Sequence, residues 1–143
     1  MGAIVVQEEG EHWTTYPKGA VEFMRARRVS GRVWNDVNVG GYLIWHLHPA
    51  CRVFMDPRLE HVYSAEQMDD YAKASAALPG WEMILEKYGP DYLLLPVDSP
   101  LASAAASGAW KAVYRDPDQV LLSRGYKGET MLGGRPPLPW LFP

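Results

Sequence analysis

The chain has 143 residues, of which 48% are hydrophobic and 22% charged, and its net charge is −3 at pH 7. These values are typical of a single folded domain and exclude an intrinsically disordered chain. They give no electrostatic basis for nucleic-acid binding, which requires a basic face. The single cysteine, Cys51, excludes an intrachain disulfide and a cysteine-based zinc site.

The N-terminal part of the chain leads into the first helix. Residues 1–15 are predicted to be a linker or an edge strand, with residues 3–6 as the segment that pairs. The helix begins at Pro17, because proline suits the first helical position. Thr14 or Thr15 is the expected N-cap.

Helices and strands then alternate along the chain. Five strands are predicted, at residues 32–35, 52–55, 91–97, 110–114 and 119–124. Helices are predicted between them, at residues 40–48, 65–77, 81–88 and 101–107. The pattern is that of an α/β domain, in which right-handed crossovers place helices on both faces of a sheet. We therefore expect a Rossmann-like three-layer sandwich over residues 16–125, with a mostly parallel sheet.

Two sequence features predict positions within that sheet. Residues 91–97 include an unbroken Tyr-Leu-Leu-Leu run, which predicts a central strand covered on both faces. The Asp116-Pro117-Asp118 segment separates the last two strands and predicts an antiparallel hairpin at the edge. With the strands numbered along the chain, the simplest order is 2-1-3-4-5.

Residues 126–143 are predicted to be a Pro-rich extended tail outside the α/β domain. The segment 135–143 is apolar and stiff. Three interpretations are open: the tail wraps its own domain, inserts into a groove of a partner, or lies at a membrane surface, where tryptophan is favoured.

Polar residues collect where the first two strands end. Ligands of open α/β sheets bind at the carboxyl ends of the strands, so these residues form a candidate site. The candidate ligand-binding residues are Asn35, Asp36, Asn38, Gly40, Gly41, Asp56 and Arg58. A structural interpretation competes with this one and is favoured: Asn35 and Asp36 cap the turn, and Asp56 pairs with Arg58 or with loop carbonyls.

No pattern for catalysis, metal or cofactor binding is found. Gly40-Gly41 lacks the spacing of a dinucleotide-binding loop. His46 and His48 are two residues apart, so on a helix they diverge and do not share a metal. No serine or cysteine has the sequence setting of an activated nucleophile. We predict no catalytic residue, no metal ligand and no cofactor in this chain.

Several motifs together resemble one family. They are Tyr16-Pro17-x-x-Ala20-x-x-Phe23, Gly31-x-Val33-x-Asn35, Gly40-Gly41-Tyr42-Leu43-Ile44-Trp45, Val53-Phe54-Met55-Asp56-x-Arg58, Trp81-x-x-x-Leu85-x-x-Tyr88-x-x-Asp91 and Trp110-x-x-Val113-Tyr114-x-Asp116. Over residues 16–124 the chain resembles the soluble C-terminal domain of polytopic bacterial membrane proteins. Those proteins are similar to glycosyltransferases of the dolichyl-phosphate-mannose protein mannosyltransferase type. The family's glycine after Asp56 is replaced here by Pro57.

The resemblance implies a context rather than a mechanism. In such enzymes the catalytic carboxylate belongs to a loop between membrane helices, so no catalytic residue carries over to this chain. The domain is expected on the extracytoplasmic, periplasmic face. Its expected partners are the membrane-embedded part of the same parent chain and a lipid-linked sugar or acceptor.

Three hypotheses for function follow. The first is an accessory, non-catalytic domain of a membrane glycosyltransferase-like protein. The second is a free-standing α/β module that binds a small ligand through the candidate residues. The third is a structural or interaction domain that docks a partner through its tail.

Overall fold

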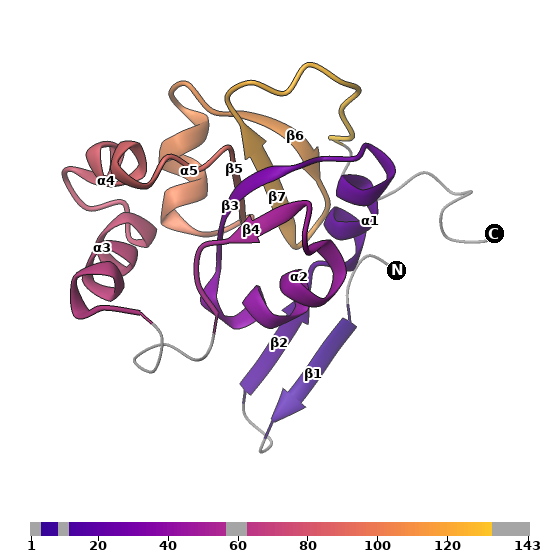
Figure 1. Cartoon of the computed structure of the whole chain (residues 1–143), viewed down its shortest axis with the longest axis horizontal. Coiled ribbons are helices and arrows are strands. Elements are labelled where there is room, and N and C mark those ends of the chain that lie inside the picture. Colours follow the sequence, from indigo (N-terminus) through magenta and orange to yellow (C-terminus); the bar gives the residue numbers. More distant parts are fainter. Residues whose placement is uncertain (1–3, 9–11, 57–62, 133–143) are drawn as a thin grey trace.

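A five-stranded mixed sheet forms the centre of the computed structural model, which describes residues 4–8, 12–56 and 63–132 (Figure 1). The strand order among these residues is β4-β3-β5-β7-β6. The strands are β3 (Gly31–Asn35), β4 (Cys51–Val53), β5 (Tyr92–Pro96), β6 (Lys111–Arg115) and β7 (Gln119–Ser123). Strand β3 is parallel to β4 and β5, whereas β7 is antiparallel to β5 and β6. The predicted α/β class and the mixture of parallel strands with an antiparallel hairpin are confirmed.

The order of the last two strands differs from the prediction. The first three strands lie as expected, but β7 is the inner strand of the hairpin and β6 is the edge. All five residues of β7 are buried, whereas Lys111 and Arg115 at the ends of β6 are exposed. Charged side chains protect a sheet edge from pairing with other chains, which suits β6 to the edge position. The apolar strand β7 needs cover on both faces, which suits it to the inner position.

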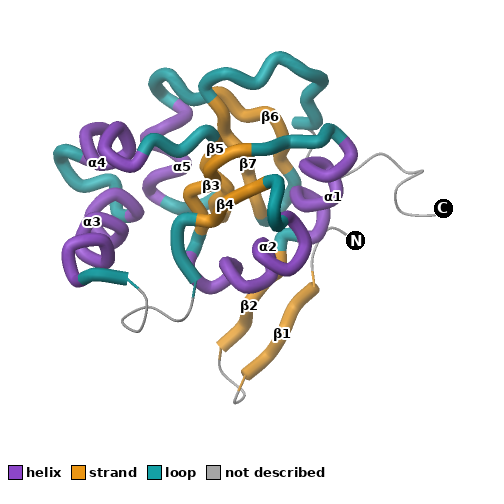
Figure 2. Tube along the Cα trace, viewed as in Figure 1, coloured by secondary structure: helices purple, strands orange, loops and turns teal. Residues whose placement is uncertain are grey.

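Helices pack against both faces of the sheet (Figure 2). Helices α1 (Lys18–Ala26) and α2 (Gly40–Leu47) share one core cluster with Val33, Leu94 and Leu121. Helices α3 (Ala65–Ser75), α4 (Trp81–Tyr88) and α5 (Pro100–Ala106) share the other. Successive residues of β5 alternate between the two clusters, because neighbouring side chains of a strand point to opposite faces.

The helix ends have local causes. Ser64 Oγ accepts a hydrogen bond from Gln67 N and caps α3, and Ser99 Oγ does the same for α5 through Ala102 N. Gly89 ends α4 in the left-handed conformation, at φ 62°. The predicted cap of α1 was wrong: Thr14 and Thr15 lie in β2, and the residue before the helix is Pro17, which supplies no side-chain cap.

A separate antiparallel hairpin precedes α1. Strands β1 (Ile4–Glu8) and β2 (His12–Tyr16) pair with each other and form a two-stranded sheet of their own (Figure 1). The ring of Tyr16 stacks on that of Tyr42 with centroids 5.0 Å apart, which joins the end of the hairpin to α2.

The first part of the predicted tail lies along the edge strand. Met131 N donates to Val113 O at 2.8 Å, and Arg115 N donates to Met131 O at 2.7 Å. Residues 126–132 therefore return to β6, as in the interpretation that the tail wraps its own domain. Residues 133–143 lie outside the described residues.

Candidate functional site

Asn35, at the end of β3, is fully buried, and its side-chain amide bonds to the backbone that follows β4. Oδ1 accepts hydrogen bonds from Phe54 N at 2.8 Å and Met55 N at 3.3 Å. Nδ2 donates to Met55 O at 2.6 Å and to Asp36 O at 2.9 Å. Both ends of the amide are therefore occupied within the protein, which assigns Asn35 a structural role.

Asp36 caps the short 3-10 helix η1 (Val37–Val39) between β3 and α2. Its Oδ1 accepts from Asn38 N at 3.0 Å. Tyr71 of α3 reaches the same turn, where its hydroxyl oxygen accepts from Val37 N at 2.8 Å. Burial raises the pKa of Tyr71 above its ordinary value, so this hydroxyl is neutral at pH 7. The side chain of Asn38 is exposed.

The two predicted glycines differ in their surroundings. A Cβ on Gly40 would lie against the carbonyl oxygen of Met55 and 2.7 Å from Cα of Asp56, so only glycine lets α2 approach this closely. A Cβ on Gly41 would meet nothing within 4 Å. Asp56 is 3% exposed, and its Oδ2 accepts from Tyr63 Oη at 2.7 Å.

The structure thus brings together four of the predicted site residues, Asn35, Asp36, Gly40 and Asp56, at the carboxyl ends of β3 and β4. Asn38 and Gly41 lie at the surface. Arg58 lies outside the described residues. Ligand binding at these positions stays a prediction, and the bonds of Asn35 and Asp36 agree with the structural interpretation.

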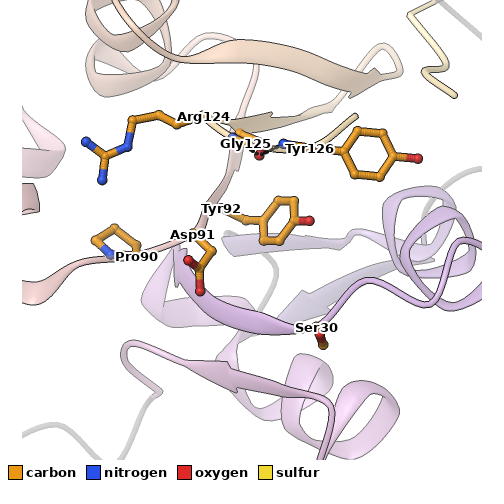
Figure 3. A pocket seen from close by; sticks show the side chains of 8 residues that line it. Ser30, Pro90, Asp91, Tyr92, Arg124, Gly125 and Tyr126 are labelled. Carbon is orange, nitrogen blue, oxygen red and sulfur yellow. Dashed lines mark hydrogen bonds between the residues drawn. The ribbon is translucent and has the colours of Figure 1, made fainter. Parts of the chain in front are cut away.

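A polar cavity of about 420 Å³ lies at the opposite ends of the strands, between the start of β5 and the end of β7 (Figure 3). Its charged groups already have partners: Asp91 Oδ2 accepts from Arg32 N at 2.9 Å, and the Arg124 guanidinium lies 4.6 Å from the ring centre of Trp110. Figure 3 shows the rings of Tyr92 and Tyr126 pointing to one side and Arg124 to the other. The side chains diverge and do not converge on a ligand position.

A second cavity, of about 350 Å³, lies on the α3–α4 face of the sheet beside β4. Its lining residues are Arg32, Val33, Arg52, Val53, Phe54, Tyr63, Gln67, Tyr88 and Pro90. Sequence reasoning missed this cavity, although a signal was present. Both predicted strands open with Arg-Val-aromatic, as Arg32-Val33-Trp34 and Arg52-Val53-Phe54, and adjacent parallel strands place such triplets side by side.

The remaining ionisable candidates lie apart from both cavities. His46 is half-buried, with its ring centre 4.3 Å from that of Tyr42, and His48 is exposed. Cys51 is buried, with Sγ 3.4 Å from Val29 O, and burial raises the pKa of its thiol. Within the described part of the chain, no group of three or more His, Cys, Asp or Glu residues is placed to hold a metal ion. No helix there is long and apolar enough to cross a bilayer.

Comparisons with protein-family models, with curated proteins and with solved structures gave no match to this chain.

Proposed function

We propose that the chain is an accessory, non-catalytic domain of a membrane glycosyltransferase-like protein, located on its extracytoplasmic face. Its partners would be the membrane-embedded part of the same parent chain and a lipid-linked sugar or acceptor. The motif resemblance supports this proposal, together with the part that the motif residues play in the fold.

One observation carries the proposal: the motif residues contact one another. Asn35 binds the backbone of Met55, and Gly40 packs against Asp56. Asp91 Oδ2 accepts from the backbone amide that follows Gly31, and a Cβ on Gly31 would lie 2.5 Å from the same oxygen.

Tyr114 and Asp116 form a further contact of this kind, because the tyrosine hydroxyl donates to Asp116 Oδ2 at 2.7 Å. The motifs therefore specify a fold. Because these motif residues bond to one another, they suit a domain that supports a neighbouring catalytic part.

A Rossmann-like three-layer arrangement is part of the proposal. It is supported by the order β4-β3-β5, in which the chain winds outward in both directions from β3. The connections carry helices on opposite faces, with α2 before β4 and α3 and α4 before β5.

An antibody raised against residues 16–125 tests the membrane context. On immunoblots of fractionated source cells, we expect a band much larger than 16.1 kDa that stays with the membranes in high salt and is released by detergent. Protease added to spheroplasts should remove the epitope, because the domain faces outward. A 16.1 kDa band in the soluble fraction, or an epitope protected in intact spheroplasts, would contradict the proposal.

A small-ligand-binding module is the second candidate function. The cavity lined by Arg32 and Arg52 favours this function. The ligand would bind there and not at the predicted residues where β3 and β4 end.

A further inference from the structure

Two arginines stand side by side in the cavity next to β4. Arg32 of β3 and Arg52 of β4 are register partners in a parallel ladder, so their side chains leave the same face of the sheet from neighbouring positions. This face carries α3 and α4 (Figure 1). The cavity of about 350 Å³ lies between the two arginines and residues of these helices, Gln67 of α3 and Tyr88 of α4. The volume is within the range of small-ligand sites.

The guanidinium groups keep most of their hydrogen-bonding capacity. Arg32 Nη1 donates to Tyr88 O at 3.2 Å, which fixes the side chain at the end of α4 and leaves its other N–H groups available. Between Arg52 and the other described residues, no side-chain hydrogen bond or ion pair is formed. Both arginines thus present donors to the cavity.

The carboxylates around the cavity are engaged elsewhere. No acidic side chain of the described residues lines it. Asp70 accepts from Lys87 Nζ at 2.8 Å and from Tyr88 Oη at 2.7 Å. Asp91 accepts from a backbone amide, and Asp56 from Tyr63. Two like charges directly opposite each other in a sheet are destabilising. An anion between them would relieve this repulsion.

Aromatic side chains form the other walls. Phe54 stacks on Trp34 with ring centres 4.1 Å apart, and Tyr88 contacts Phe54 edge-on at 4.9 Å. Tyr88 is held further by its bond to Asp70. These rings are fixed before any ligand arrives, and a flat apolar group can pack against them at low entropic cost.

We propose that this cavity binds a small organic anion, in which a phosphate or carboxylate group is carried on a flat apolar body. The oxyanion lies between Arg32 and Arg52, whose planar N–H forks match both oxyanions. The body packs against Phe54 and Tyr88, and the amide of Gln67 at the cavity wall serves a further polar group. This site does not depend on the membrane context proposed above, because it rests on the described residues alone.

Calorimetric titration of the purified chain with four probes tests the proposal. We expect phenyl phosphate or benzoate to bind with a Kd of about 1 mM or tighter at low salt, and the tighter of the two identifies the oxyanion. Inorganic phosphate and benzyl alcohol, which each lack one half of the ligand, should bind at least about tenfold more weakly. Absence of binding by both aromatic anions, or equal binding of benzyl alcohol, would overturn the proposal.

Arg52→Gln is the decisive variant, because the Arg52 side chain forms no hydrogen bond or ion pair with the other described residues that the substitution would break. The variant should weaken binding of the better aromatic anion by about tenfold or more, as expected for loss of charge-assisted hydrogen bonds. It should also melt no lower than the wild type, since it removes one of two like charges at paired positions of neighbouring strands.

Arg115→Gln is the matched control, because Arg115 is an exposed arginine on the opposite edge strand. It should leave the affinity unchanged. Equal affinities of Arg52→Gln and the wild type, or equal weakening by both variants, would reject the site. Calorimetry tests the anion site and cell fractionation tests the membrane context, so either proposal can be rejected without the other.

Discussion

At the scale of single residues, Asn35 extends the sheet beyond the reach of its shortest strand. Strand β4 ends at Val53, yet the chain continues beside β3 through Phe54 and Met55. Phe54 N donates to Val33 O at 2.9 Å. Beyond this bond the side-chain amide of Asn35 takes the place of a neighbouring strand's backbone, because it accepts from Phe54 N and donates to Met55 O. A buried side chain of this kind is costly to remove, because it leaves backbone groups without partners.

Asn35→Ala should therefore lower the free energy of unfolding by about 3 kcal/mol, the cost of leaving buried polar groups unpaired and opening a small cavity. Urea unfolding followed by circular dichroism measures this. Asn38→Ala is the matched control, since Asn38 is exposed, and its effect should stay within about 0.5 kcal/mol. Similar losses for the two variants would show that Asn35 has no special role.

The residues near Asn35 show what local patterns can predict. Polar residues at the ends of two adjacent strands were expected to meet, because parallel strands end at the same edge, and Asn35, Asp36 and Asp56 do. The sequence did not predict that the hydroxyl oxygen of Tyr71, 36 positions after Asn35, accepts a hydrogen bond from Val37 N in this turn. Such a contact depends on how α3 packs, and that packing has no signature in the local pattern.

At the scale of elements, the start of α2 lies unusually close to the chain leaving β4. The cause is Gly40, where a Cβ would overlap the Met55 carbonyl oxygen. The next residue, Gly41, is exposed and faces open space. The two neighbouring glycines therefore provide an internal comparison.

Gly40→Ala should destabilise the protein by about 3 kcal/mol, because the helix must move away from backbone that cannot yield. Gly41→Ala should instead stabilise it by about 0.5 kcal/mol, since alanine restricts the unfolded chain and favours the helix. Thermal unfolding of both variants gives the two signs. If both variants were destabilised alike, the close approach of α2 would not be the cause.

The order of the hairpin strands shows where element-level prediction ends. The apolar runs of β6 and β7 and the Asp116-Pro117-Asp118 turn are enough to predict two strands that form a hairpin. Which of the two lies inside depends on the pairing with β5. The charged ends of β6, Lys111 and Arg115, were the available signal, because they mark an edge strand.

At the scale of the whole molecule, buried tyrosine hydroxyls link stability to alkaline pH. Burial is the first cause that raises the pKa of five tyrosines: Tyr42, Tyr71, Tyr88, Tyr92 and Tyr114. Tyr114 is the most strongly affected, because Asp116 beside its hydroxyl also disfavours the phenolate. Its folded-state pKa lies above the ordinary value of about 10. The stability that depends on the neutral hydroxyl is complete below about pH 10 and is lost as pH rises above it.

Tyr114→Phe should lower the free energy of unfolding by about 1 kcal/mol at pH 7, through loss of the hydrogen bond to Asp116. The deficit should shrink between pH 10 and about pH 11.5, because only the wild type must keep this hydroxyl protonated. Urea unfolding at pH 7, 9, 10 and 11.5 measures the difference. A deficit that stays constant or grows over this range would contradict the assigned pKa shift.

The overall architecture could be predicted because the chain repeats its signals. Apolar runs mark the strands and helices, and proline and glycine mark their ends. Ser64 and Ser99 mark the starts of α3 and α5. These signals all indicate the same alternation of helices and strands. The hairpin of β1 and β2 was missed because only one of its strands was expected and the other was assigned to a linker. One link between the hairpin and the domain is the Tyr16–Tyr42 stack, a tertiary contact that periodicity does not encode.

The inner position of β7 also sets the order in which the sheet is completed during synthesis. The ladder of β4, β3 and β5 involves residues 31–96 and can form while the rest of the chain is still being made. Strand β6 leaves the ribosome before β7 but has no neighbour to pair with until residues 119–123 emerge between it and β5. Until then the edge of β5 is bare, and the nascent chain carries an open template for pairing with other chains. Among the strands of the described residues, the last to appear is the one that closes the sheet.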